Sequence, residues 1–470
     1  MNQRQPTLTT GSVGRTLLWM TVPMMFGHFS TVAFNLADTL FVAQLGAKEL
    51  AALSFTFPVV QLVAGIAIGL GIGTGAVVSQ AIGNRDQHLV RRLATHSLIL
   101  SVVIASVLSA VGWLTINPLF RLLGATDDIL PMINDYMGIW YIAAIFTVVP
   151  MVGNNSIRAT GDTMFPSLIM VISAGLNVIL DPLLIFGWAG FPRMELKGAA
   201  LATLIARVLG FLAALAILHF RDRLLDFTLP RLATLWDSWK RILSIGAPTV
   251  GTMILMPASM GVVTKIASGF GYEAVAALGA GTRIGTLAML LVRSLSTVLV
   301  VFIGQNWGAR RFDRIHTAQR HSFWFSFGWG VFCAVVLSLC ARPLGRLFSD
   351  QAEVIGYIAL YLYVVPIGYG LRGICQLTGA VLNAVNRPLR SLAINVVRMC
   401  VLYVPLAFCG SMVFRHLGGS DWHGYLGLLS GTTAANIFGG LLSILVLRAS
   451  LATLEEPFEP VVAAPYEEVE

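Results

Sequence analysis

The chain has 470 residues, of which 56% are hydrophobic and only 11% are charged, and its mean hydropathy is +0.78. About a quarter of the residues of a soluble chain are usually charged, so this composition excludes an ordinary soluble protein and indicates a membrane protein. The formal net charge of +8 is no sign of a nucleic-acid partner, because most basic residues fall in short loops between apolar runs, where membrane topology explains them better.

Apolar runs long enough to cross a hydrocarbon core of about 30 Å recur along the whole chain. They predict an all-α polytopic membrane protein with twelve transmembrane helices. The predicted spans are 16–44, 50–82, 93–115, 130–152, 163–190, 198–219, 240–269, 274–306, 317–341, 352–373, 388–413 and 425–448.

Lysine and arginine are distributed unevenly between alternate loops. The N-terminus and the loops on its side hold 18 of them, the opposite loops hold seven, and six fall within spans. Because positive loops stay in the cytoplasm, we expect both termini on the cytoplasmic side of the inner (plasma) membrane. The sequence leaves open the role of the six basic residues within spans, which are Arg207, Lys265, Arg283, Arg293, Arg372 and Arg398.

The two halves of the chain repeat each other. Shifting the sequence by 225 residues aligns 15–136 with the second half without a gap, and the identical pairs include Gln80/Gln305, Gly83/Gly308 and Tyr136/Tyr361. Six spans per half make the two copies parallel, an arrangement found in transporters whose halves rock around a substrate site near the midplane.

The repeat also sets the expected domains. We predict two pseudo-symmetric six-helix lobes, 1–219 and 240–450, joined by a cytoplasmic linker at 220–239 that contains a short amphipathic helix from Leu232 to Trp239. The acidic, proline-rich tail at 451–470 lacks periodicity and is predicted to be disordered.

Small residues recur at four-residue spacing in the second span, at Gly65, Gly69 and Gly73. This ridge predicts that another helix packs closely against the span. In the first span, His28 is expected to be a hydrogen-bonded core residue.

Two carboxylates fall near the centre of predicted spans, Asp38 in the first and Asp181 in the fifth. A charge at mid-bilayer costs about 2.5–3.5 kcal/mol, so an acid there is a candidate functional residue. The repeat pairs them with Val263 and Leu406, so the acids belong to the first half alone. We therefore expect the first lobe to handle the coupling ion.

Amides accompany both acids. Asn35 precedes Asp38 by one helical turn, and Asn177 precedes Asp181 by four residues and shares its helix face. Pro182 frees a backbone carbonyl at the same place. Such a group suits a proton carrier, because burial disfavours a charged carboxylate, and its oxygens suit a Na⁺ ion equally well.

Several motifs together resemble the MATE (multidrug and toxic compound extrusion) transporters, and most of all their DinF-like branch. They are Asn35–Asp38, Pro23, RATGDT at 158–163, NVILDPLLIFG at 177–187, GAALAT at 198–203 and GQNWGARR at 304–311. The resemblance implies the MATE fold and the export of amphipathic, often cationic, organic compounds in exchange for H⁺ or Na⁺. By motif position it implies an ion-coupling network of Asp38, Asn154, Asn177, Asp181 and Thr203, with Pro23 as a hinge.

The sequence departs from the family pattern in two places. Phe34 stands where members often have tyrosine, and the seventh span carries Thr264 and Lys265 but no acid. We expect the substrate cavity to include Phe34 and Asn35. Methionine adapts to ligands of varied shape, so Met24, Met256 and Met260 are further candidates for its lining.

The favoured function is therefore secondary antiport, with H⁺ as the expected coupling ion and no cofactor. If Na⁺ is the ion instead, Asp38, Asn177, Asp181 and Thr203 would be its ligands. A flippase for a lipid-linked precursor and a channel or receptor are the alternatives. The sequence has no Walker A or HExxH motif, so no enzyme is expected. Expected partners are small drugs or toxic organic cations and membrane lipid, and the protein is expected to be a monomer.

Overall fold

The structure is a computed structural model that describes residues 8–226, 228 and 230–452. These residues form helices and connecting turns, with no β-strand among them. Twelve helical segments of the described chain are long and apolar enough to cross a membrane, which confirms the predicted all-α class and number of spans. The tail predicted to be disordered lies outside the described residues from position 453 onward.

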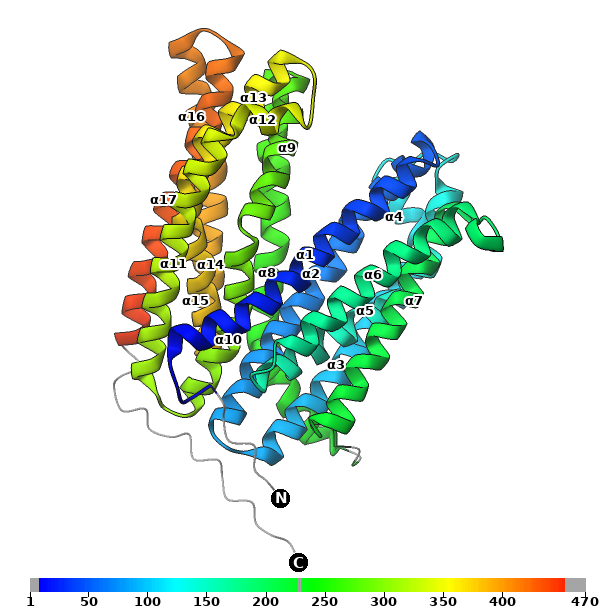
Figure 1. Cartoon of the computed structure of the whole chain (residues 1–470), viewed down its shortest axis with the longest axis vertical. Helices are drawn as coiled ribbons and strands as arrows, with labels where there is room; N and C mark the ends of the chain where they lie inside the picture. Colours follow the sequence, from blue (N-terminus) through cyan, green and yellow to red (C-terminus); the bar gives the residue numbers. More distant parts are fainter. Residues whose placement is uncertain (1–7, 227, 229, 453–470) are drawn as a thin grey trace, which may run out of the picture.

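The helices form two groups that meet at one end of the molecule and diverge toward the other (Figure 1). We name them the first bundle, α1–α7, and the second bundle, α8–α17. The first bundle contains α1 (Val13–Ala43), α2 (Ala47–Gly83), α3 (Gln87–Leu114), α4 (Ile116–Leu122), α5 (Leu130–Ala159), α6 (Met164–Phe186) and α7 (Glu195–Ala216). The second bundle contains α8 (Leu232–Ala267), α9 (Tyr272–Ala288), α10 (Leu290–Gly308), α11 (Phe312–Leu339), α12 (Ala341–Arg346), α13 (Ala352–Val364), α14 (Tyr369–Ala384), α15 (Pro388–Val396), α16 (Val404–Gly418) and α17 (Asp421–Ala452).

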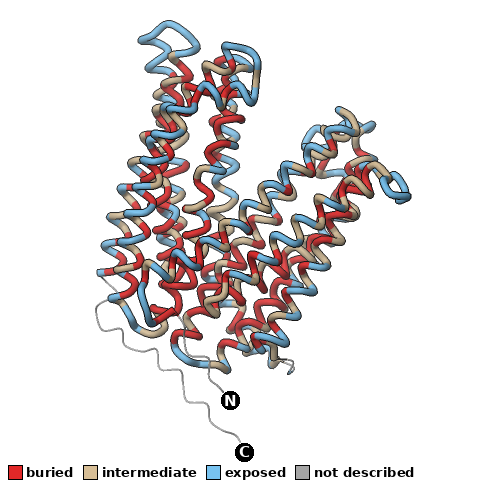
Figure 2. The backbone as a smooth tube through the Cα atoms, viewed as in Figure 1, coloured by how far each residue is buried: buried red, intermediate tan, exposed pale blue. Residues whose placement is uncertain are grey.

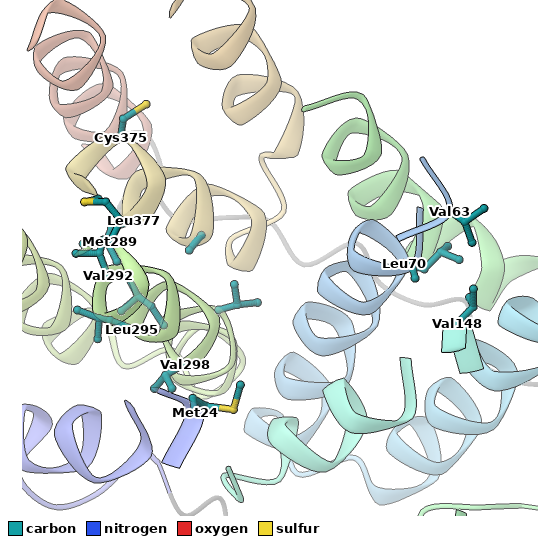
Figure 3. Packing of buried hydrophobic residues seen from close by; sticks show 14 of the residues in the cluster. Met24, Val63, Leu70, Val148, Met289, Val292, Leu295, Val298, Cys375 and Leu377 are labelled. Atoms are coloured by element: carbon teal, nitrogen blue, oxygen red, sulfur yellow. The ribbon is translucent and has the colours of Figure 1, made fainter. Parts of the chain in front are cut away.

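The outer surface of the bundles carries large apolar side chains, as contact with lipid requires. Trp19, Phe26 and Leu36 on α1 are all more than half exposed. Figure 2 shows buried residues inside each bundle and where the bundles meet, and exposed residues along the outer faces and at the ends. Figure 3 shows part of the buried hydrophobic packing, in which Val292, Leu295 and Val298 follow one another along α10.

The seventh span begins earlier than predicted. Residues 232–239 are helical, as predicted, but they form the first turns of α8 and are continuous with the seventh span. This extension is fixed to α3, because the Trp239 indole donates to the His96 carbonyl at 3.1 Å and Arg92 pairs with Asp237 at 3.0 Å.

Three spans of the second bundle are interrupted. The predicted eighth span divides at Met289 into α9 and α10, where the Trp329 indole donates to the Ala288 carbonyl at 2.8 Å. A 3-10 turn, η4 (Val365–Gly368), separates α13 from α14, and a π-helical turn, η5 (Val397–Tyr403), separates α15 from α16.

The bundles meet through backbones that approach closely. A Cβ added to Gly73 of α2 would lie 2.5 Å from the Ile242 carbonyl oxygen of α8, and one added to Gly69 would lie 2.9 Å from the Gly246 carbonyl oxygen. The predicted close packing against the glycine ridge is therefore confirmed. Nearer the end, the two glycines paired by the repeat do the same, since a side chain on Gly83 would clash with the Gln305 backbone and one on Gly308 with the Gln80 backbone.

Two equivalent hydrogen bonds join the bundles at this end. The Gln80 amide donates to the Ala384 carbonyl, and the Gln305 amide donates to the Ala159 carbonyl, each at 2.7 Å. The donors are 225 residues apart, and so are the acceptors. Each bundle therefore holds the last turn of a helix in the other by the same contact.

Enlarging Gly83 should separate the bundles at this end. We expect Gly83→Leu to lengthen the distance between spin labels on the exposed positions His88 and Arg320, because the new side chain occupies the space of the Gln305 backbone. Pulsed electron paramagnetic resonance measures this distance in a chain whose five native cysteines have been replaced. Gly328→Leu is the control, since a Cβ there meets nothing within 4 Å. An unchanged distance in Gly83→Leu would show that the glycine contact does not hold the bundles together.

Candidate functional site

The two acids lie inside the first bundle. The exposed fraction of Asp38 is 9% and that of Asp181 is zero, and the two are close enough to interact electrostatically. Each lies five residues before the end of its helix, α1 and α6, toward the diverging end of the molecule. The sequence predicted that both acids lie near the centres of their spans; in the structure each lies nearer the end of its helix than the middle.

Asp181 belongs to a hydrogen-bonded group with Asn177 and Thr203. When the amide is oriented to satisfy both of its ends, Asn177 Nδ2 donates to Asp181 Oδ2 at 2.8 Å. Asn177 Oδ1 then accepts from the Thr203 hydroxyl at 3.2 Å and from the Thr203 backbone N–H at 3.1 Å. The four-residue spacing on α6 creates the first contact, and the packing of α7 against α6 supplies the second.

One oxygen of each acid has no partner. Asp38 Oδ1 and Asp181 Oδ1 are buried without a hydrogen bond. Buried polar atoms are usually paired, so these two oxygens are available to a ligand of the site. A proton on either oxygen would remove the negative charge of that carboxylate.

Two residues near the acids were not predicted. Tyr136 of α5 is buried and interacts electrostatically with Asp38, Asp181 and Arg207. Arg207 of α7 also lies over the Phe34 ring, with its Cζ 5.8 Å from the ring centroid. Tyr136 belongs to an identical pair of the repeat, and Arg207 is a basic residue within a span, so both carried a sequence signal without a predicted role.

Asn154 is buried but lies apart from this group. It precedes the end of α5 by five residues, whereas Asp181 follows the start of α6 by 17. Because a short turn joins these neighbouring helices, the two residues are about 18 Å apart along the helix axes at 1.5 Å per residue. The structure thus brings together Asp38, Asn177, Asp181 and Thr203, but not Asn154.

The expected cavity residues divide between exposed and buried positions. Asn35 and Met256 are exposed, and the half-buried Met260 contacts the Tyr403 hydroxyl through its sulfur at 4.0 Å. Phe34 is buried beneath Arg207. Met24 does not line a cavity, because it is fully buried and its sulfur contacts the Ser167 hydroxyl at 3.4 Å.

Along α1, the two bundles begin to separate after His28, toward the diverging end. The His28 Nδ1 lies 3.0 Å from the Ser294 hydroxyl of α10, so this residue is hydrogen-bonded as predicted. Asn35 and Thr39 follow at intervals that keep them on the face of His28, and both are exposed. Pro23 lies inside α1, which remains one helix across it. One face of α1 therefore contacts the second bundle at His28. The same face no longer contacts that bundle at Asn35.

Known proteins match over nearly the whole chain. A family model named MatE matches residues 23–183 and 248–409, two segments whose starts differ by the 225 residues of the internal repeat. The FAD transporter of Shewanella oneidensis is 37% identical over 92% of this chain and 94% of its own. The probable multidrug resistance protein YoeA of Bacillus subtilis is 26% identical, covering 88% and 90%. A mutant of the Vibrio cholerae MATE transporter VcmN superposes with a TM-score of 0.88 at 30% identity, covering 94% and 97%.

Removing the Asn177 amide should destabilise the first bundle. We expect Asn177→Leu to lower the free energy of unfolding by about 1–3 kcal/mol, because it leaves Asp181 Oδ2 and the Thr203 hydroxyl buried without partners. Denaturant unfolding of the purified protein in detergent measures the change. Asn35→Leu makes the same substitution at an exposed position and should have little effect. Equal stability of the two variants would mean that the Asn177 contacts contribute nothing.

Proposed function

Because this chain belongs to the MATE family of membrane transporters, we propose that it is a secondary antiporter that exports amphipathic organic molecules in exchange for protons. The family consists of transporters and not of enzymes, and the structure of this chain has the twelve-span fold of its solved relatives. The observation that carries the proposal is the pair of buried acids in the first bundle, each with an oxygen that has no partner.

The proposed direction of transport follows from the loop charges. The loops that connect helices at the meeting end carry most of the lysine and arginine, so we place this end and both termini in the cytoplasm. The diverging end then faces outward. In this orientation the described conformation is closed to the cytoplasm by the Gln80 and Gln305 contacts and open to the outside.

The chemistry of proton coupling follows from the geometry of the acids. Two negative carboxylates that lie close enough to interact in a buried site repel each other, and a proton on either one would relieve that repulsion. Uptake from the outside would remove a negative charge from the interior of the first bundle. The hydrogen bonds around Asp181 would then rearrange, and α1, which carries both Asp38 and Pro23, would move relative to α10. Release to the cytoplasm would restore the charge.

The arrangement fits a proton better than Na⁺. A Na⁺ ion needs several oxygen ligands. In this conformation the Asn177 amide donates its N–H to Asp181, and its oxygen accepts hydrogen bonds from Thr203. A proton needs only one oxygen, and the unpaired oxygens of Asp38 and Asp181 each offer one.

The transported molecule has two candidate classes. The sequence favours drugs and toxic organic cations, and the relative YoeA is named as a probable multidrug resistance protein. The relative from Shewanella oneidensis is named as an FAD transporter, so a flavin dinucleotide is the second candidate. Placement in the DinF-like branch also belongs to this proposal. It is supported by two acids in the first bundle and by the absence of an acid from residues 240–269, the predicted seventh span.

The role of Asp38 is tested by removing its charge. We expect Asp38→Asn to abolish export driven by a pH gradient, because an amide has nearly the same volume but cannot exchange a proton. Efflux of a fluorescent cationic dye and of FAD from proteoliposomes provides the measurement. Asp128→Asn, at an exposed position near the diverging end, should transport like the wild type. Full pH-driven export by Asp38→Asn would reduce Asp38 to a packing residue.

The coupling ion is tested with the wild type. We expect efflux to follow an imposed pH gradient in Na⁺-free buffer, and to ignore a Na⁺ gradient at fixed pH. The reason is that the Asn177 oxygen is already bonded to Thr203 and is not available to a metal ion. Efflux that requires Na⁺ and ignores the pH gradient would assign the same residues to a Na⁺ site.

A further inference from the structure

The spans of the second bundle contain basic residues, whereas the two buried acids of the candidate site lie in the first bundle. Of the basic residues, Arg398 is buried, Arg372 is half-buried, and Lys265, Arg283 and Arg293 are exposed; the acids of the described residues of this bundle lie at or near the helix ends. No carboxylate of the described chain forms an ion pair with Arg372 or Arg398. Cations within a membrane span are costly, so two of them without counter-ions need an explanation.

Arg398 is held in place by hydrogen bonds, but one of its donors has no partner. Its exposed fraction is 8%, and it lies in the π-helical turn η5. One guanidinium nitrogen donates to Asn436 Oδ1 at 3.3 Å and another to Asn395 Oδ1 at 3.2 Å, while Nε is buried without a partner. Gly439 of α17 makes room for the side chain, because a Cβ there would lie 2.6 Å from Arg398 Cγ.

Arg372 is the second member of the group. It is half-buried on α14, and its Cζ lies 5.9 Å from the centroid of the Tyr369 ring. Arg372 and Arg398 are close enough to interact electrostatically, and Tyr403 lies near both. Like charges near one another in a buried site repel, so an anion bound between the two guanidinium groups would stabilise both.

The helix interruptions of the second bundle surround these arginines. Arg398 is part of η5, and Tyr369 directly follows η4. A Cβ on Gly368 of η4 would lie 3.3 Å from the Cβ of Asn436, the residue that accepts from Arg398. Interrupted helices inside membranes occur where they line a site or a cavity, and π-helical turns are frequent at functional sites.

The repeat provides an internal comparison. Tyr136 and Tyr361 are paired by the 225-residue shift and both are buried. Tyr136 interacts electrostatically with Asp38 and Asp181 as well as with Arg207, whereas the one charged residue that interacts with Tyr361 among the described residues is Arg372. The same position therefore faces acids in the first bundle alone, and a duplicated fold does not by itself require them.

We propose that Arg372 and Arg398 bind a phosphate or diphosphate group of the transported molecule, with Tyr369 and Tyr403 beside it; the proposal rests on the antiporter function. Two guanidinium groups offer planar, charged donors that match phosphate oxygens, and the Nε of Arg398 supplies one donor that has no other partner. This chemistry assigns the substrate to the amphipathic anions. A purely cationic drug would be repelled from the same place.

Two sources share this chemistry, a soluble nucleotide such as FAD and a lipid-linked diphosphate. The test therefore compares matched probes on the purified full-length protein in nanodiscs. FAD, FMN and riboflavin differ in their phosphate content, and farnesyl diphosphate and farnesol differ in the same way. Flavin binding is followed by fluorescence quenching, and binding of the prenyl compounds by calorimetry.

We expect Arg398→Gln and Arg372→Gln to weaken binding of the phosphorylated probe at least tenfold, since each removes a charge-assisted contact. Binding of the partner probe without phosphate should stay unchanged. Arg346→Gln is the matched control, because it lowers the net charge equally at an exposed position in α12 at the diverging end. Arg398→Lys should recover only part of the affinity, because it restores the charge without the planar donors.

Several outcomes would overturn the proposal. One is equal binding of phosphorylated and unphosphorylated probes by the wild type, and another is an equal effect of the arginine variants on both. Arg372 makes no hydrogen bond to the described residues that a glutamine would break, so Arg372→Gln tests the site even if Arg398→Gln fails to fold. Dependence on the arginines for farnesyl diphosphate alone would support the site and identify a lipid source. If the arginine variants bind every probe like the wild type and still transport with a pH gradient, this site is rejected and the antiporter proposal is unaffected.

Discussion

The contact between the two bundles is the constraint on which the rest of the molecule depends. In it α2 approaches α8 and α10 at glycines, and two reciprocal glutamine–carbonyl bonds join α2 to α14 and α10 to α5, all toward one end. Because the contact is confined to one end, the faces beyond His28 and Met253 are free of each other. Alternating access requires this combination of a close contact at one end and separation at the other.

Each bundle contains a polar centre that lipid alone would not tolerate, and the two centres have opposite sign. The acidic centre is stabilised by one hydrogen bond from Asn177, and in the proposed mechanism a proton completes it. The basic centre is stabilised by two asparagine oxygens, and in the proposed site an anion completes it. Burial raises the free energy of an unpaired charge, so both centres favour the bound state of their ligand. The helix α1, which carries Asp38, packs against α10 of the second bundle, and α14, which carries Arg372, ends at the Ala384 carbonyl that Gln80 bonds. Helices of both centres therefore take part in the contact between the bundles.

The parts predicted from sequence are those set by one helix or by periodicity. Hydropathy gave the number of spans, the glycine spacing gave the α2 contact, and the four-residue spacing joined Asn177 to Asp181. Contacts between helices were harder, because they depend on rotation and depth that no local pattern records. Asn154 was assigned by motif position and lies about 18 Å along the helix from the acids. The arginines of the second bundle were noticed as charges within spans, but their proximity depends on η4 and η5, and irregular turns have no periodic signal.

The sign of the second centre changes the energetics of the proposed exchange. The cell interior is negative, and each elementary charge that crosses the membrane is worth about 2.3 kcal/mol per 100 mV. Export of a cation works against this potential and must be driven by the incoming proton. Export of a phosphorylated anion moves negative charge outward while the proton moves positive charge inward, so the potential drives both steps in the same direction. An antiporter with acids in one bundle and arginines in the other would therefore be strongly electrogenic, and the membrane potential would contribute to export even where the pH gradient is small.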